Sequence, residues 1–267
     1  MELSLSEKVC YSTLRIEATI GPNSISTGTG FFFNFNIGDD KSTICLVTNN
    51  HVIENSTTTA MVLSCWDATG AILHESFQVE TKLWIPHPDP NIDLCLFPFQ
   101  SVMAILLSMG KVPIIAPLDE SIVPSNEQLE ALSSIEDIIM IGYPDGIWDK
   151  FNNQPIVRRG ITATHVKNDF NGKSEFLIDA ACFPGSSGSP VLILNSGGYV
   201  DKRGNLNWGG GRIFLLGVLR AGPQHTAEGT IQFANIPRFY TGIPNNLGLV
   251  IKSSKLLDFR TKLLSML

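Results

Sequence analysis

Short apolar runs alternate with turn-forming residues along most of the chain, which is the pattern of an antiparallel β protein. In the first part of the sequence, β-branched and aromatic residues predict strands at 14–17, 30–37, 42–48, 59–63, 77–83 and 94–97. Later strands are expected at 138–141, 156–159, 162–166, 176–178, 191–194, 213–219 and 247–251. Because the strands are short and separated by turns, the pattern predicts two antiparallel barrels in one chain.

A few segments depart from the strand pattern. Residues 3–17 begin with mildly helical spacing, 102–109 fit a short helix, and 255–267 have the apolar spacing of an amphipathic helix. The Gly- and Asn-rich stretch 197–211 is expected to be a turn or hairpin, and 223–244 an insertion before the last strand. We therefore expect an all-β fold with short helices near both ends.

The connection between the barrels is expected where prolines interrupt the pattern. Pro113, Pro117 and Pro124 are followed by the acidic and polar run 125–130. The prediction is a single unit over 1–267, in which 1–124 form an N-terminal barrel. Residues 125–267 then form a C-terminal barrel and the C-terminal helix.

Composition narrows the class of protein. The chain has 267 residues, of which 43% are hydrophobic and only 16% charged, and this balance is typical of a compact globular protein. Its formal charge of −6, without a basic stripe, argues against a nucleic-acid partner. The longest apolar stretch is too short to span a bilayer, so we expect no membrane partner.

Cysteine use and the N-terminal residues suggest a compartment. The five cysteines are odd in number and lack metal-ligand spacing, so we expect buried thiols in a reducing environment and no metal site. The first residues lack the basic and apolar regions of a secretory signal. From these features we expect a cytoplasmic location.

One stretch, Asp179 to Pro190, has a composition suited to chemistry. Glycine, serine and proline separate two apolar runs there and predict a tight, irregular turn. Small residues on both sides of Ser187 let a substrate backbone come close. They also let the amides of Gly185 and Ser187 point into one small space, as an oxyanion hole requires.

A serine nucleophile needs an imidazole base that is oriented by a third group. His51 follows an apolar strand where polar residues begin, and Asp93 stands at the head of another. Asp89 is the rival for the orienting carboxylate, and the apolar strand after Asp93 favours Asp93. A thiol nucleophile at Cys182 is disfavoured because that cysteine precedes the apex of the turn.

Several motifs in order resemble those of trypsin-like serine peptidases of the bacterial kind, nearest to the HtrA-type protease domain and the glutamyl endopeptidases. They are Thr29-Gly30-Phe31-Phe32, Thr48-Asn49-Asn50-His51-Val52, Asp93-Leu94, Ile141-Gly142-Tyr143-Pro144, Asp179-Ala180-Ala181, Gly185-Ser186-Ser187-Gly188-Ser189-Pro190 and Leu247-Gly248-Leu249-Val250-Ile251. The resemblance implies a chymotrypsin-like fold of two six-stranded antiparallel β-barrels. It also implies a protein or peptide substrate and no cofactor.

The resemblance also places a specificity pocket, by position relative to Ser187. Its floor falls on Ala181 with Cys182 beside it, and its walls on Leu219, Gly248 and Val250. The floor carries no acid and position 219 no histidine, which argues against cleavage after Lys, Arg or Glu. An apolar preference is expected, with one alternative open: Arg220 would recruit an acidic side chain if it turned inward.

Ser186 stands where the zymogen-forming members carry an acid that receives a new N-terminus. We therefore expect no activating cleavage, and control by loop ordering or a partner protein. The predicted function is a serine endopeptidase that uses Ser187, His51 and Asp93, forms an acyl-enzyme and cleaves after apolar residues. Two alternatives stay open: a catalytically silent binding module on a protease fold, and a partner-activated protease with a single cognate substrate.

Overall fold

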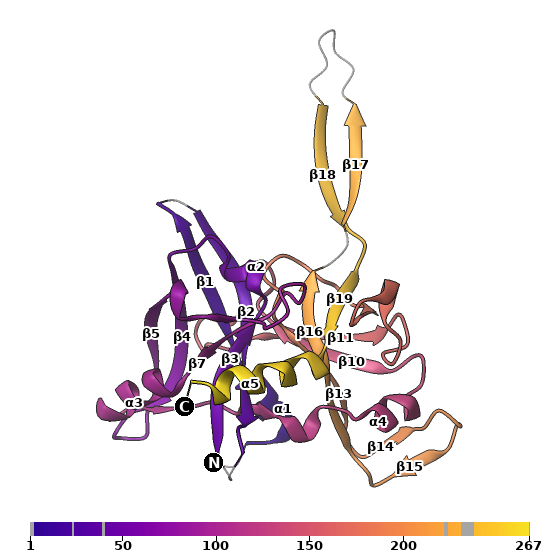
Figure 1. Cartoon of the computed structure of the whole chain (residues 1–267), viewed down its shortest axis with the longest axis horizontal. Helices are drawn as coiled ribbons and strands as arrows, with labels where there is room; N and C mark the ends of the chain where they lie inside the picture. Colours follow the sequence, from indigo (N-terminus) through magenta and orange to yellow (C-terminus); the bar gives the residue numbers. More distant parts are fainter. Residues whose placement is uncertain (1–2, 23, 39–40, 222–223, 231–237, 267) are drawn as a thin grey trace.

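The structure is a computed structural model that describes residues 3–22, 24–38, 41–221, 224–230 and 238–266. Two groups of strands lie side by side, one from the N-terminal half of the chain and one from the C-terminal half (Figure 1). Strands predominate and the helices are short. The predicted all-β, chymotrypsin-like class is therefore confirmed.

The N-terminal half forms a nine-stranded sheet in the order β5-β4-β1-β2-β3-β7-β6, with β8 beside β4 and β9 parallel to β2. The closed six-stranded barrel expected in this half is therefore not found among the described residues. The predicted six strands are present, but β6, β8 and β9, each two residues long, extend them to nine. The strands are β1 (Thr13–Gly21), β2 (Ser24–Asn36), β3 (Ser42–Thr48), β4 (Thr58–Trp66), β5 (Ile72–Glu80), β6 (Ile85–Pro86), β7 (Cys95–Pro98), β8 (Val112–Pro113) and β9 (Leu118–Asp119).

The C-terminal half contains the closed six-stranded barrel that the sequence predicts, in the order β10-β11-β12-β19-β16-β13. Its strands are β10 (Asp137–Gly142), β11 (Ile156–Thr162), β12 (Glu175–Asp179), β13 (Pro190–Asn195), β16 (Arg212–Ala221) and β19 (Leu247–Lys252). The separate strand expected at 162–166 is wrong. The chain turns there, and the amides of Ala163 and Thr164 both donate to the carbonyl of Leu177.

Two hairpins extend the C-terminal half. The first, β14 (Gly198–Val200) with β15 (Leu206–Trp208), confirms the hairpin expected in 197–211. The second, β17 (Gln224–Thr230) with β18 (Arg238–Pro244), occupies the expected insertion and projects away from the two halves (Figure 1). Residues 223 and 231–237 of that insertion lie outside the described residues.

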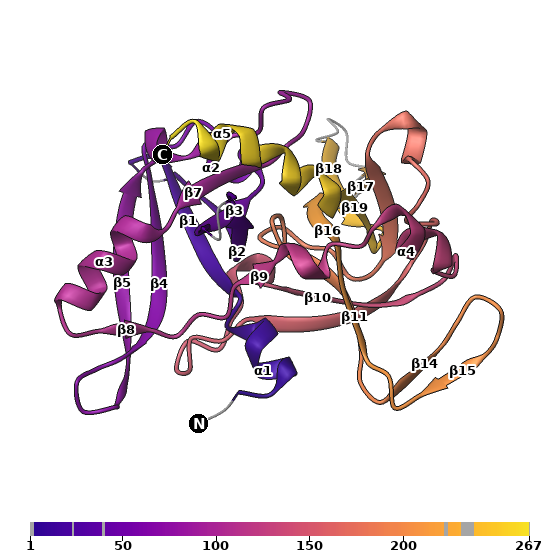
Figure 2. The ribbon, with the colours of Figure 1, turned by 60° about the horizontal axis from the view of Figure 1, so that its bottom comes forward.

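The helices are α1 (Leu5–Cys10), α2 (Asn50–Ile53), α3 (Gln100–Ser108), α4 (Asn126–Ala131) and α5 (Arg260–Leu264). Ser4 begins α1 with a capping box, because its hydroxyl accepts from the amide of Glu7 and the Glu7 carboxylate accepts from the amide of Ser4. The predicted C-terminal helix begins as a 3₁₀ helix over Ser253–Phe259 and continues as α5 (Figure 2). In the described part of the chain, no helix is long and apolar enough to cross a membrane.

Strand β2 divides its phenylalanines between two cores because successive side chains of a strand face opposite sides. Phe32 packs in the core of the N-terminal half with Phe99, at a ring-centroid distance of 4.9 Å. Phe31, Phe33 and Phe35 face a second core, which the C-terminal half shares through residues such as Leu215. The C-terminal barrel has a third core of its own. The predicted boundary at 124/125 stays a prediction.

Candidate active site

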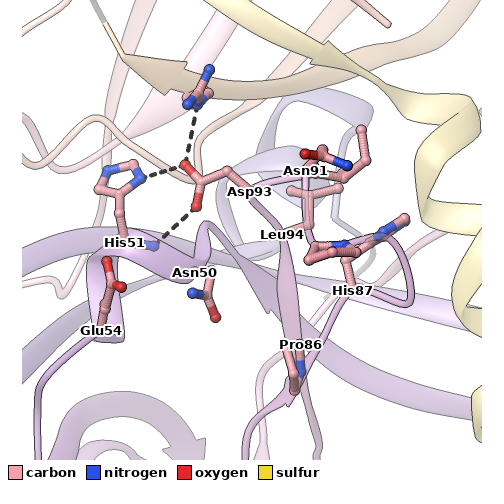
Figure 3. A pocket seen from close by; sticks show the side chains of 11 residues that line it. Asn50, His51, Glu54, Pro86, His87, Asn91, Asp93 and Leu94 are labelled. Carbon is pink, nitrogen blue, oxygen red and sulfur yellow. Dashed lines mark hydrogen bonds and ion pairs between the residues drawn. The ribbon is translucent and has the colours of Figure 1, made fainter.

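His51 and Asp93 meet at one end of the N-terminal sheet. β3 ends at Thr48, and the chain turns into α2, which carries His51. β7 pairs with β3, with Cys95 opposite Thr48, so the loop before β7 brings Asp93 to the same end. His51 Nδ1 lies 2.6 Å from Asp93 Oδ2, and the His51 amide donates to Asp93 Oδ1 at 3.0 Å (Figure 3). The carboxylate thus fixes both the ring and the backbone of the histidine.

Asp93 is held from several sides. The side-chain amide of Asn49 donates to the Asp93 carbonyl at 2.9 Å, which anchors the loop. Burial alone would raise the pKa of Asp93. Hydrogen bonds from His51 and the charges of His51 and Arg220 outweigh it, so this pKa lies below its usual value of 3.8. Asp93 is therefore ionised at neutral pH.

Ser187 lies on the turn between β12 and β13, where both halves of the chain hold the backbone. Its carbonyl accepts from the amide of Thr29 at 2.8 Å, and the amide of Gly188 donates to Leu219 at 2.8 Å. Gly188 has φ +88°, and a Cβ there would lie 1.9 Å from the Thr29 carbonyl, so only glycine fits. The Ser187 hydroxyl donates to the carbonyl of Arg220 at 2.9 Å, and among the described contacts it makes no hydrogen bond to His51.

The backbone before Ser187 is oriented from outside the turn. The Pro184 carbonyl accepts from the Asp145 amide at 2.5 Å, and the Gly185 carbonyl accepts from the Thr29 hydroxyl at 3.0 Å. In a trans peptide the C=O and N–H point in opposite directions, so the Gly185 amide faces away from Asp145. Within the described residues, neither the Gly185 nor the Ser187 amide has an acceptor. Both amides are available to a ligand.

Four of the six residues expected at the specificity pocket lie together in the C-terminal half, namely Cys182, Leu219, Gly248 and Val250. Leu219 pairs with Val250 across β16 and β19, and both are buried. A Cβ on Gly248 would lie 2.7 Å from Cys182 Sγ and 2.8 Å from Leu219 Cδ1, so these side chains share one small space. Ala181 is half-buried, and its carbonyl accepts from Arg158.

The sixth residue, Arg220, does not join them through its side chain. Its Nε lies 3.4 Å from Asp93 Oδ2 and its Nη1 lies 3.1 Å from Glu175 Oε1. The inward turn that would recruit an acidic side chain is therefore not the conformation found. The guanidinium instead stands behind the His51–Asp93 pair.

A cavity of about 580 Å³ opens beside His51 and Asp93. Its lining includes His51, Asp93 and Arg220 together with Glu54 and Asn91 (Figure 3). It is wide enough for a side chain or a short stretch of peptide.

Burial bears on two residues that the sequence analysis considered beside the site, Cys182 and Ser186. Burial raises the pKa of the Cys182 thiol to about 11, although Arg158 opposes the shift, so this thiol stays protonated at neutral pH. Ser186 is buried, and its hydroxyl has no hydrogen-bond partner in the described part of the chain. All five cysteines are free thiols, and four of them are buried.

Sequence reasoning missed three residues that support the site. Thr29 and Asp145 hold the peptide groups around Gly185, and Glu175 pairs with Arg220. Thr29 and Asp145 lie in or next to the motifs that carry the family resemblance, which was an available signal. Nothing near Glu175 in the sequence indicates its contact with β16.

Known proteins show similarity to the chain at the level of a family model and of solved structures. We found no curated protein whose sequence matches the chain. Solved structures that are similar include a serine endoprotease from Yersinia pestis, with 16% identity, a TM-score of 0.46, and coverage of 99% of this chain and 68% of the other. The active form of the Rv3671c protease from M. tuberculosis shares 16% identity, with a TM-score of 0.45 and coverage of 93% and 78%. The HL collagenase shares 14%, with a TM-score of 0.49 and coverage of 96% and 94%.

The family model described as the trypsin-like peptidase domain matches residues 28–200, which is more than half of the chain. The match spans His51, Asp93 and Ser187. The chain belongs to the trypsin-like peptidase family.

Proposed function

We propose that the protein is a serine endopeptidase that hydrolyses peptide bonds of protein or peptide substrates. The observation that carries the proposal is the contact of 2.6 Å between His51 Nδ1 and Asp93 Oδ2, in a chain of the trypsin-like peptidase family. An ionised carboxylate on Nδ1 keeps the proton on that nitrogen, which leaves Nε2 free to act as a base. Ser187 is then the nucleophile, His51 the general base and Asp93 the orienting acid.

The reaction begins with a rotation of the Ser187 hydroxyl from the Arg220 carbonyl towards His51. The hydroxyl leaves the Arg220 carbonyl by a change of the Ser187 χ1 angle between staggered rotamers. His51 takes the hydroxyl proton while the oxygen attacks the substrate carbonyl carbon. The amides of Gly185 and Ser187 stabilise the oxyanion, and each such donor contributes about 3 to 4 kcal/mol in enzymes of this kind.

The acyl-enzyme forms when the tetrahedral intermediate collapses. His51 gives its proton to the leaving amine, and the carbon–nitrogen bond breaks. A water molecule then attacks the ester, with His51 again as base, and hydrolysis restores the Ser187 hydroxyl. The proposed mechanism requires no cofactor.

We further propose cleavage after medium-sized apolar residues. Cys182 and Leu219 are buried apolar side chains next to Gly248, Leu219 pairs with the buried Val250, and Arg220 is engaged elsewhere. Burying an apolar side chain there contributes on the order of 1.5 to 3 kcal/mol, whereas an unpaired charge costs more. A peptide library should show preference for Val, Leu, Ala or Met before the scissile bond.

A partner-activated protease is the second candidate, favoured by one observation. The Ser187 hydroxyl donates to the Arg220 carbonyl rather than to His51, so a ligand or partner that reorients it would increase activity. Activation by cleavage is not expected, because Ser186 replaces the acid that would receive a new N-terminus. Intact-mass measurement of an active preparation should therefore show no N-terminal truncation beyond loss of Met1.

A fluorophosphonate probe tests the peptidase assignment against the silent binding module. The probe phosphonylates only an activated serine, so wild type should react and Ser187→Ala should not. His51→Ala should react far more slowly, although its fold is retained. Wild-type protein that melts cooperatively yet remains unlabelled would support the binding module instead.

A further inference from the structure

Arg220 connects Asp93 to a second carboxylate in the other half of the molecule. Its backbone lies in β16 of the C-terminal barrel, and its guanidinium reaches Asp93 in the N-terminal half at 3.4 Å. The same guanidinium lies 3.1 Å from Glu175, the first residue of β12. The side chains of Asp93 and Glu175 are 16% and 9% exposed and that of Arg220 is 36% exposed, so water screens the two carboxylates weakly and the guanidinium in part. We call these three residues the charge chain.

Two donors compete for one oxygen of Asp93. Oδ2 faces both the Nδ1 of His51 and the Nε of Arg220. An unbalanced cation at this point would withdraw the carboxylate charge from His51 and oppose a positive charge on the ring. Glu175 supplies the balance. The two carboxylates and one guanidinium together carry the single negative charge that Asp93 would carry alone.

We propose that Glu175 and Arg220 are positioning residues that set the proton affinity of His51 through Asp93. The proposal rests on the proposed function, in which His51 is the general base. The Arg220 guanidinium holds the Asp93 carboxylate in place by an ion pair between the two halves of the molecule. The negative charge of Glu175 offsets the guanidinium charge, so that this ion pair does not lower the proton affinity of His51. Neither side chain is expected to touch the substrate carbonyl or the attacking oxygen, since Arg220 contacts the Ser187 hydroxyl only through its backbone carbonyl.

Other charged or titratable groups around His51 come from three neighbouring segments. Glu54 follows α2 and lines the same cavity, where it is exposed, and His87 lines it from the loop before β7. Cys95 is buried next to Asp93, and burial raises the pKa of its thiol. Among the described contacts, none of these three groups forms an ion pair with Asp93, whereas Arg220 does.

The test is an NMR titration of the His51 imidazole in Ser187→Ala protein, which needs no turnover. The His51→Ala variant identifies the His51 signal, and His74 and His165 serve as internal references. When Glu175→Gln is combined with Ser187→Ala, the Arg220 charge is left unbalanced. The protonation midpoint of His51 should then move to lower pH by about 0.5 unit or more. Added Arg220→Gln should move it to higher pH, and the double substitution should restore the starting midpoint.

A matched control is Asp169→Asn, which removes a carboxylate from the Lys252 pair in the same half of the molecule. It should leave the His51 midpoint unchanged. Shifts of the two test variants in the same direction, or in neither, would overturn the proposal. If Arg220→Gln does not fold, Glu175→Gln decides alone, since only a downward shift supports the mechanism.

The titration separates this proposal from the proposed function. A protein that shows opposite shifts but never reacts with the fluorophosphonate retains the charge chain and lacks peptidase activity. In a reactive protein, the acidic limb of the labelling rate against pH should move in the same directions as the NMR midpoints. A purely structural role of Glu175 would lower stability without moving either midpoint.

Discussion

Replacement of Thr29 by valine should damage the proposed oxyanion hole from the opposite half of the molecule. The Thr29 hydroxyl is fully buried and donates to the Gly185 carbonyl at 3.0 Å. It also accepts from the Tyr143 amide at 3.1 Å. Valine has nearly the same shape but satisfies neither group, so the substitution leaves one buried carbonyl and one buried amide without their partner.

The expected loss of stability follows from those two groups. An orphaned buried group costs about 1 to 3 kcal/mol, so the two groups together should lower the free energy of unfolding of Thr29→Val by about 2 to 6 kcal/mol. Loss of a whole oxyanion donor costs about a hundredfold to a thousandfold in rate. Thr29→Val keeps the Gly185 amide but removes a hydrogen bond that fixes the backbone of Gly185. The labelling rate should therefore fall by a smaller factor, about tenfold to a hundredfold.

The assay combines urea unfolding, followed by tryptophan fluorescence, with the fluorophosphonate labelling rate. Thr59→Val is a matched control, because the Thr59 hydroxyl is equally buried, accepts from Trp84 at 3.0 Å and donates to Val79 at 3.4 Å. It should lose stability but keep the labelling rate. Thr29→Ser should keep most of both. Equal labelling by Thr29→Val and Thr59→Val would refute the reasoning.

Three further outcomes are expected. Ser187→Ala should abolish hydrolysis with an almost unchanged melting temperature, and His51→Ala should lose nearly as much activity because triad residues act as a unit; peptide-cleavage rates and thermal melts check both. The lowered pKa of Asp93 adds stability above its usual value of 3.8, and this is lost as the pH falls through its folded-state pKa. The urea midpoint should therefore fall more steeply between about pH 5 and about pH 3 in wild type than in Asp93→Asn. Gly188→Ala should prevent stable folding because of the Thr29 carbonyl 1.9 Å away, whereas Gly209→Ala, with open space around it, should still melt cooperatively.

Much of the fold could be predicted because apolar alternation and turn chemistry coincide along the chain. β3 was predicted with its observed bounds, Ser42–Thr48, since β-branched and apolar residues there end in a polar cap. β2 is longer than predicted, because the polar residues 24–29 pair with β1 without an apolar pattern of their own. At 162–166 the residues have strand propensity, yet no separate strand forms. Val166 is buried and has strand propensity, but the chain must turn there to reach the 3₁₀ helix at Phe170–Gly172.

The site shows the same division between local and distant information. Gly185 and Ser187 could be selected because a glycine–serine turn is a local signal. The direction of the Arg220 side chain could not, since it depends on Glu175, which lies far away in the sequence and next to no motif. Side-chain direction in a β-strand depends on register and on partners across the sheet, and local spacing contains neither.

The alternation of phenylalanines along β2 affects how easily the two halves of the molecule separate during partial unfolding. One strand inserts Phe32 into a core of the N-terminal half and Phe33 into a core that residues of both halves complete. Opening of the junction between the halves would expose three aromatic rings at once, each worth on the order of 1.5 to 3 kcal/mol of burial. Partial opening is therefore costly, and the segments between the two halves should be poorly accessible to cleavage by an added protease.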